Sequence, residues 1–287
     1  MNIIKQIDAL RENINQAKKQ NKTIVFIPTM GFLHQGHLSM AELARRQDET
    51  RSKFYIVMSI FVNPLQFGPN EDYDKYPRDL SRDAELAQRA GVDIIFAPTV
   101  HEMYPEGTSL TTVSVAEVTE GLCGAGRPGH FQGVTTVVSK LFNIVQPDIA
   151  YFGQKDYQQA ITIKKMVQDL NFPIEIIVAP TVREQDGLAM SSRNSYLSPE
   201  ERRQAPVLYR SLQEGAALIK QGETRPEIIR EKIVQRIRNE STGQIEYVEI
   251  RNADNLATTS IIDSNVVIAL AVRLGSTRLI DNIVVEV

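Results

Sequence analysis

Short, strand-like apolar runs alternate with helical patterns through the first 180 residues, and this alternation constrains the fold more than any other feature. The strand-like runs cover residues 23–27, 54–61, 92–97, 148–152 and 174–179. Helical patterns cover residues 37–47, 79–90, 134–145 and 157–170. Strands that alternate with helices form βαβ units, so we expect a parallel sheet with helices on both faces.

The two ends of the chain extend this pattern differently. At the N-terminus, Ile3, Ile7, Leu10, Ile14 and Ala17 recur at spacings of four and three, which predicts one helix. After residue 198, two helices near 199–220 and 226–239 precede extended segments at 247–250, 266–272 and 283–287. No helices separate these last segments, so we expect a smaller α+β domain with an antiparallel sheet. A chain of 287 residues has room for about two domains, and we place them at 1–181 and 182–287.

Composition narrows the class of protein. The chain has 32 Lys and Arg against 35 Asp and Glu, a net charge of −3, which argues against a nucleic-acid partner. The single cysteine, Cys123, excludes an intrachain disulfide framework and a multi-cysteine metal site. Neither a secretory signal nor an apolar membrane span is apparent. We therefore expect a cytoplasmic protein with no membrane or nucleic-acid partner.

In open parallel sheets, ligands bind beyond the carboxyl ends of the strands, so the segments that follow the strands hold the candidate site. The first of them, residues 28–37, leads from a strand into a helix, where free backbone N–H groups favour an anion. Gly31 and Gly36 permit close approach to the backbone, and His34 and His37 can share one side of the first turn. A phosphate site is one interpretation. A metal pair, or one core and one surface histidine, is the other.

The remaining segments are less specific when each is taken alone. Asn63 and Gln66 offer oriented amides, or cap a loop. The glycine-rich segment 121–133 is either a flap or a subunit contact. Lys155 can neutralise a phosphate, or is simply solvated. Residues 183–194 combine serines with an arginine fork and suit a polyphosphate, or form a polar interdomain loop.

Taken together, these motifs resemble a known family. The element His34-Gln-Gly-His37 and the downstream Met190-Ser-Ser-Arg193 resemble the HIGH and KMSKS signatures of the nucleotidyltransferase superfamily. A closer resemblance, to the pantoate–β-alanine ligases, adds the segments Phe61-Val-Asn-Pro-Leu-Gln-Phe67, Arg127-Pro-Gly-His-Phe131 and Phe152-Gly-Gln-Lys-Asp-Tyr-Gln-Gln159.

This resemblance implies a two-step reaction. The carboxylate of pantoate attacks ATP to give pantoyl adenylate and pyrophosphate, and the amine of β-alanine then forms pantothenate and releases AMP. The resemblance also implies a homodimer, Mg²⁺ with ATP, a Rossmann-like N-terminal domain and a C-terminal lid. An adenylyltransferase that keeps AMP in its product, an RNA-binding synthetase fragment and an inactive ATP-binding module are the alternatives.

The resemblance assigns roles residue by residue. His37 is the expected proton donor, with His34 and Lys155 as further catalytic groups. The expected ATP-binding residues are Met30, Gly31, Phe32, Leu33, His34, Gln35, Gly36, His37, Gly153, Gln154, Lys155, Asp156, Val182, Met190, Ser191, Ser192 and Arg193. Gln66 is expected to bind pantoate and β-alanine, and Gln159 to bind pantoate. Asn63 is expected to contact the phosphate region or β-alanine, and Tyr76 to lie near the substrates. No residue is assigned to a metal.

Overall fold

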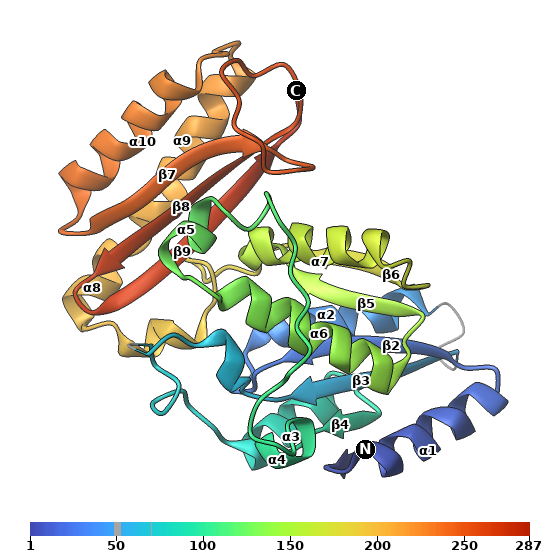
Figure 1. The fold of residues 1–287 in the computed structure, drawn as a ribbon. Helices are drawn as coiled ribbons and strands as arrows, with labels where there is room; N and C mark the ends of the chain where they lie inside the picture. Colours follow the sequence, from blue (N-terminus) through green and yellow to red (C-terminus); the bar gives the residue numbers. More distant parts are fainter. Residues whose placement is uncertain (49–52, 70) are drawn as a thin grey trace. The chain divides into compact units, whose positions relative to one another are not determined.

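The computed structural model describes residues 1–48, 53–69 and 71–287. Their contacts divide the chain into two compact units (Figure 1). The first unit comprises Met1–Val115, Arg127–Gly153 and Thr162–Pro180. The second comprises Ala116–Gly126, Gln154–Ile161 and Thr181–Val287, so two short segments that precede residue 162 join the C-terminal unit. The predicted boundary between residues 181 and 182 stays a prediction.

A six-stranded sheet forms the centre of the first unit, and all its pairings are parallel. The strand order is β1-β4-β3-β2-β5-β6. The strands are β1 (Asn2–Ile4), β2 (Thr23–Thr29), β3 (Phe54–Ile60), β4 (Ile94–Phe96), β5 (Ile149–Gly153) and β6 (Glu175–Ala179). This confirms the predicted Rossmann-like sheet, and the strand order reverses between β2 and β5.

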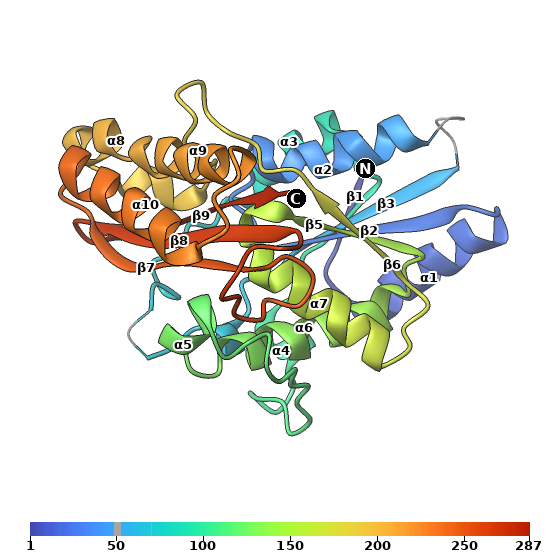
Figure 2. The same ribbon diagram turned by 90° about the horizontal axis from the view of Figure 1, so that it is seen from above.

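Helices cover both faces of this sheet (Figure 2). On one face, α2 (Gln35–Gln47) and α3 (Leu80–Arg89) pack onto Val25, Ile27 and Met58. On the other face lie α1 (Ile7–Lys19) and α6 (His130–Val145). The side chain of Asp79 caps α3 by accepting a hydrogen bond from the Arg82 N–H.

Two predictions for the first unit are wrong. Ile3 belongs to the short edge strand β1 and is 45% exposed, so the helical face begins only at Ile7. A strand of three residues is too short to show an alternating pattern in the sequence, and β1 is extended because it pairs with β4. Pro28 does not end its strand but lies within β2. Proline has no backbone N–H, so it is tolerated only where the strand needs no donor. Thr29 O points towards β3, so the backbone of Pro28, one residue earlier, points towards β5. β5 pairs with β2 only at Val25 and Phe26 and needs no donor from Pro28.

The second unit contains the antiparallel sheet that the sequence predicts, in the order β7-β8-β9. Its strands are β7 (Gln244–Asn252), β8 (Val266–Leu274) and β9 (Thr277–Val285), all longer than expected. Helices α9 (Val207–Lys220) and α10 (Pro226–Glu240) pack on one face and share a core of aliphatic side chains with it. The predicted helix over 199–220 is two helices, because α8 (Pro199–Gln204) stops before Pro206.

The shorter elements are the helices α4 (Val100–Met103) and α5 (Leu122–Gly126) and the 3₁₀ turns η1 (Pro64–Gln66), η2 (Gln154–Asp156) and η3 (Ser192–Tyr196). Helix α7 (Tyr157–Asp169) follows η2, and its residues divide between the two units. Of the helices in the described ranges, none has the length and apolar character needed to cross a bilayer.

Candidate active site

The loop Met30–His34 follows β2 directly, at the point where the order of the parallel strands reverses. Sheets of this kind bind their ligands in the crevice at such a switch point. The loop then opens helix α2 at Gln35, with His34 as its N-cap. All the predicted residues from Met30 to His37 therefore lie together, in the place that the sequence predicts.

A buried carboxylate holds this loop. Asp83 of α3 is 0% exposed, and its two oxygens accept the backbone N–H groups of Phe32 and Leu33, each at 2.7 Å. Burial raises the pKa of Asp83, and the two backbone hydrogen bonds oppose that rise. Gly31 has φ +84°, and a Cβ there would lie 2.8 Å from the Ile60 side chain. The loop thus requires glycine at this turn and a hydrogen-bond acceptor beneath it.

The two histidines form a reciprocal cap at the start of α2. The Gly36 N–H donates to His34 Nδ1 at 3.1 Å, and the His34 N–H donates to His37 Nδ1 at 3.3 Å. The two rings lie 4.1 Å apart between centroids. Because each Nδ1 is an acceptor, each neutral ring carries its proton on Nε2. The backbone therefore selects the tautomer that presents an Nε2–H donor on both histidines.

The predicted substrate residues of the first unit also meet this loop. The Gln66 amide nitrogen lies 3.1 Å from Met30 Sδ, and its Oε1 accepts from Asn63 Nδ2 at 3.2 Å. Asn63 is 1% exposed and also donates to Gly133 O, while its Oδ1 accepts from Leu65 N–H and Tyr104 O–H. Asn63 thus has the capping role that the sequence left open. Its direct contact with a substrate stays a prediction.

A second network holds the backbone of Gln66. His130 Nδ1 donates to Gln66 O at 2.8 Å, so its Nε2 is the acceptor for Arg127 Nη1 at 2.9 Å. Arg127 also binds both carboxylate oxygens of Glu71, each at 2.6 Å. Burial alone would raise the pKa of Glu71, but the hydrogen bonds and charge of Arg127 outweigh it and hold that pKa below its usual value. Tyr76, predicted near the substrates, is 5% exposed and packs edge-on against Phe67.

Apart from Gly153, the other predicted site residues belong to the second unit. Lys155 lies on η2 with its side chain 20% exposed and its ammonium 3.8 Å from Asp156 Oδ1. Gln159 is half-buried on α7. Its neighbour Gln158 is buried and bonds Cys123 N, Val118 O and Gly121 O, which fixes the start of the segment 121–133. Gly153, the end of β5, lies in the first unit.

Met190–Arg193, here called the serine-rich loop, follows a tight hairpin in which the Met190 N–H donates to Val182 O at 3.0 Å. Ser191 caps η3, since its hydroxyl accepts from the Arg193 N–H at 3.3 Å. Asn194 Nδ2 donates to Glu184 Oε1 and to Ala189 O, which ties the end of the loop to the hairpin. These bonds connect the residues on either side of Ser191–Arg193 to the hairpin.

Sequence reasoning missed several residues that build these loops. They are Glu71, Asp83, Asp281 and Asn282. Each acts on a segment far away in the sequence, so no local motif marks it. Cys123 is buried, with its Sγ 3.1 Å from the Tyr247 hydroxyl, as expected for a packed thiol.

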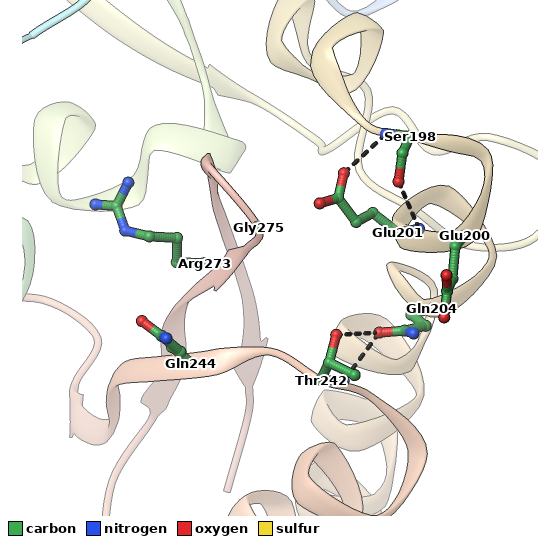
Figure 3. A pocket seen from close by; sticks show the side chains of 8 residues that line it. All are labelled: Ser198, Glu200, Glu201, Gln204, Thr242, Gln244, Arg273 and Gly275. Carbon is green, nitrogen blue, oxygen red and sulfur yellow. Dashed lines mark hydrogen bonds between the residues drawn. The ribbon is translucent and has the colours of Figure 1, made fainter.

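A polar pocket in the second unit contains none of the predicted site residues (Figure 3). Several of its lining side chains bind one another. Ser198 and Glu201 form the capping box of α8, and Gln204 Oε1 accepts from both the N–H and the hydroxyl of Thr242. These bonds give the lining a structural role at both ends of α8.

Comparison with known proteins identifies the family. The chain matches the sequence model of the pantoate-beta-alanine ligases over residues 2–284. The pantothenate synthetase of Desulfitobacterium hafniense (strain DSM 10664 / DCB-2) is 60% identical over 286 residues, covering 100% of this chain and 99% of that protein. The pantothenate synthetase of Acetivibrio thermocellus is 57% identical over 287 residues, covering 100% of both.

Solved structures agree with this match. The pantothenate synthetase of Thermus thermophilus superposes with a TM-score of 0.91 at 46% identity, over 99% of both chains. The pantoate-beta-alanine ligase of Francisella tularensis, solved with beta-gamma ATP and beta-alanine, superposes with a TM-score of 0.78 at 34% identity, over 99% of this chain and 97% of that one. The chain therefore belongs to the pantoate–β-alanine ligase family.

Proposed function

We propose that the chain condenses pantoate with β-alanine in an ATP-dependent reaction that yields pantothenate, AMP and pyrophosphate. The observation that carries this proposal is the loop Met30–His37 at the switch point of the sheet, where the backbone fixes an Nε2–H donor on both His34 and His37. The identity of the substrates is inferred from the family to which the chain belongs.

In the first step, a carboxylate oxygen of pantoate attacks the α-phosphorus, and the bond from that phosphorus to the bridging oxygen breaks. Pyrophosphate leaves with the electron pair. Negative charge grows on the phosphate oxygens, so the enzyme's main contribution is positioning and electrostatic stabilisation. His37 and His34 donate Nε2–H bonds to those oxygens, and Lys155 and Arg193 add positive charge.

In the second step, the amine of β-alanine attacks the acyl carbon of pantoyl adenylate, and the bond to AMP breaks. The nitrogen loses a proton as the amide forms. Gln66 binds both pantoate and β-alanine through its amide, and Gln159 binds pantoate. Asn63 and Tyr76 support this pocket, and the bonds of Asn63 give it a part in placing Gln66. The other residues predicted to bind ATP complete the nucleotide site.

Bound to the phosphates of ATP, Mg²⁺ would stabilise their negative charge. Within residues 1–48, 53–69 and 71–287, no three His, Cys, Asp or Glu side chains group closely enough to hold a metal ion. We assign no protein ligand to it, and every step above depends on the chain's own residues. We further propose that the protein is cytoplasmic and forms a homodimer. Analytical ultracentrifugation tests the dimer.

Product analysis tests the proposed function. With ATP, pantoate and β-alanine, phosphorus NMR should detect AMP and pyrophosphate in equal amounts, and mass spectrometry should detect one pantothenate for each AMP. An adenylyltransferase would instead retain AMP in its product. Formation of ADP and phosphate would contradict the adenylate route.

A further inference from the structure

Two adjacent residues of β9, Asp281 and Asn282, are each 3% exposed and lie on opposite faces of the strand. Each binds a different segment of the second unit. A buried polar side chain costs stability unless it is hydrogen-bonded, so these contacts show what the two side chains hold in place.

Asp281 holds the hairpin that leads into the serine-rich loop. Its two oxygens accept from Arg183 Nη1 and Nη2 at 2.7 and 2.9 Å, a bidentate pair with little solvent access. The Arg183 guanidinium lies 3.7 Å from the ring centre of Tyr209 and donates to Gly187 O at 3.0 Å. Gly187 is the hairpin tip, with φ +93°, and Met190 follows three residues later.

Asn282 holds the turn that carries Lys155. Its Nδ2 donates to Gln154 O and to Lys155 O, each at 2.9 Å. Two carbonyl acceptors fix the orientation of the amide, since the opposite orientation would place oxygen against oxygen. Its Oδ1 is buried and has no hydrogen-bond partner among the described residues. An aspartate here would lose both donors and place a negative charge beside two carbonyls.

We propose that Asp281 and Asn282 are positioning residues, through which one strand fixes both the Lys155 turn and the loop Met190–Arg193 for the adenylation step. This inference rests on the proposed function, in which Lys155 and Arg193 act on the phosphates of ATP. Burial raises the pKa of Asp281, and the hydrogen bonds and charge of Arg183, together with the charge of Lys155, oppose that rise. The carboxylate thus interacts with cations from both segments.

The first test is Asn282→Asp, with Asn255→Asp as the matched control. Asn255 is exposed, and its Oδ1 accepts from Ala257 N–H, a bond that aspartate retains. Single-turnover adenylation at saturating ATP should fall about 10- to 100-fold in Asn282→Asp, because small displacements of a catalytic group cost rates of this order. Aminolysis of supplied pantoyl adenylate by β-alanine should change less than about 3-fold, since no pyrophosphate leaves in that step.

A double-mutant cycle with Lys155→Ala separates positioning from general loss of structure. If Asn282 acts through Lys155, then Asn282→Asp should cause little further loss of adenylation in the Lys155→Ala background. Equal losses in both backgrounds, equal losses in both half-reactions, or adenylation as in Asn255→Asp would overturn the role of Asn282. If Asn282→Asp does not fold, Asn282→Ala removes the donors without adding a charge, and the same outcomes decide.

Asp281→Asn tests the other contact, with the ion pair Glu223–Arg225 altered as Glu223→Gln for comparison. The KM for ATP should rise about 10-fold in Asp281→Asn, because the loop Met190–Arg193 would no longer be held in position to bind the nucleotide. It should stay unchanged in Glu223→Gln. Where Asp281→Asn does not fold, Arg183→Lys keeps the charge but loses the bidentate bond. An unchanged KM would overturn the role of Asp281.

The unaltered enzyme is the reference in every assay. If it forms no pantoyl adenylate, the proposed function fails and this inference fails with it. If it forms pantoyl adenylate while the β9 variants behave as their controls do, this inference alone fails.

Discussion

His34 and His37 illustrate how backbone geometry can determine side-chain chemistry. Both Nδ1 atoms accept backbone N–H groups, from Gly36 and His34 respectively. A neutral imidazole has one donor and one acceptor, so this arrangement leaves the proton on Nε2 in each ring. The spacing of three residues predicts two histidines on one turn, but only the structure shows which nitrogen is the donor.

His37→Asn and His37→Gln separate the cap from the donor. Asparagine can still accept the His34 N–H but has no group at the Nε2 position, whereas glutamine places an amide N–H near it. His37→Asn should slow adenylation by about 10²–10³-fold, as for loss of a preorganised donor, and His37→Gln should restore part of that rate. Single-turnover kinetics of both half-reactions measure this. Equal rates in the asparagine variant and the unaltered enzyme would contradict it.

Asp83→Asn tests the support of the same loop. Asparagine has one acceptor oxygen where two backbone N–H groups need acceptors, so one N–H would face an NH₂ group. The free energy of unfolding should fall by about 1–3 kcal/mol, and adenylation should slow. Urea denaturation and adenylation kinetics check both effects. Asp8→Asn, at a side chain that is 95% exposed, serves as the control and should change neither.

At the scale of elements, the sequence predicted the strands and helices whose pattern is local. The runs that became β2, β3, β5 and β6 carry enough apolar residues to mark them. The edge strand β1 has only three residues and gains its extended shape from pairing with β4. The candidate site likewise has parts that the sequence predicts and parts that it does not. The motif loops could be found, but Asp83, Asp281 and Asn282 act across 50 to 128 residues of sequence, and such contacts leave no periodic pattern.

The ion pair between Glu71, which follows η1, and Arg127, which precedes α6, should make the free energy of unfolding depend on pH. The pKa of Glu71 lies below its usual value of 4.5, so the native state releases this proton more readily than the unfolded chain does. The stabilisation by the Glu71–Arg127 pair is therefore complete above that usual value and is lost as pH falls through the lowered pKa.

Denaturation of the unaltered protein and Glu71→Gln between pH 7 and pH 3 measures this contribution. The stability difference between the two proteins should be constant at neutral pH and should shrink towards pH 3. A difference that grows as pH falls would have the wrong sign. Glu231→Gln alters an exposed carboxylate in the other unit and controls for general effects of charge removal.

At the scale of the whole molecule, the chain passes more than once between its two units. Segments Ala116–Gly126 and Gln154–Ile161 belong with Thr181–Val287, although a Rossmann-like segment separates them in sequence. Each unit has its own aliphatic core and its own share of the predicted site residues. The composition and length predicted two domains, but the return of short segments to the second unit depends on tertiary contacts such as Asn282 with Lys155.

The central claim is that the enzyme first forms pantoyl adenylate and only then uses β-alanine. ATP–pyrophosphate exchange with pantoate alone tests this most directly, since labelled pyrophosphate enters ATP only if adenylation is reversible without the amine. The account predicts rapid exchange that requires pantoate, falls strongly in His37→Asn and needs no β-alanine. Exchange that appears only after β-alanine is added would contradict it.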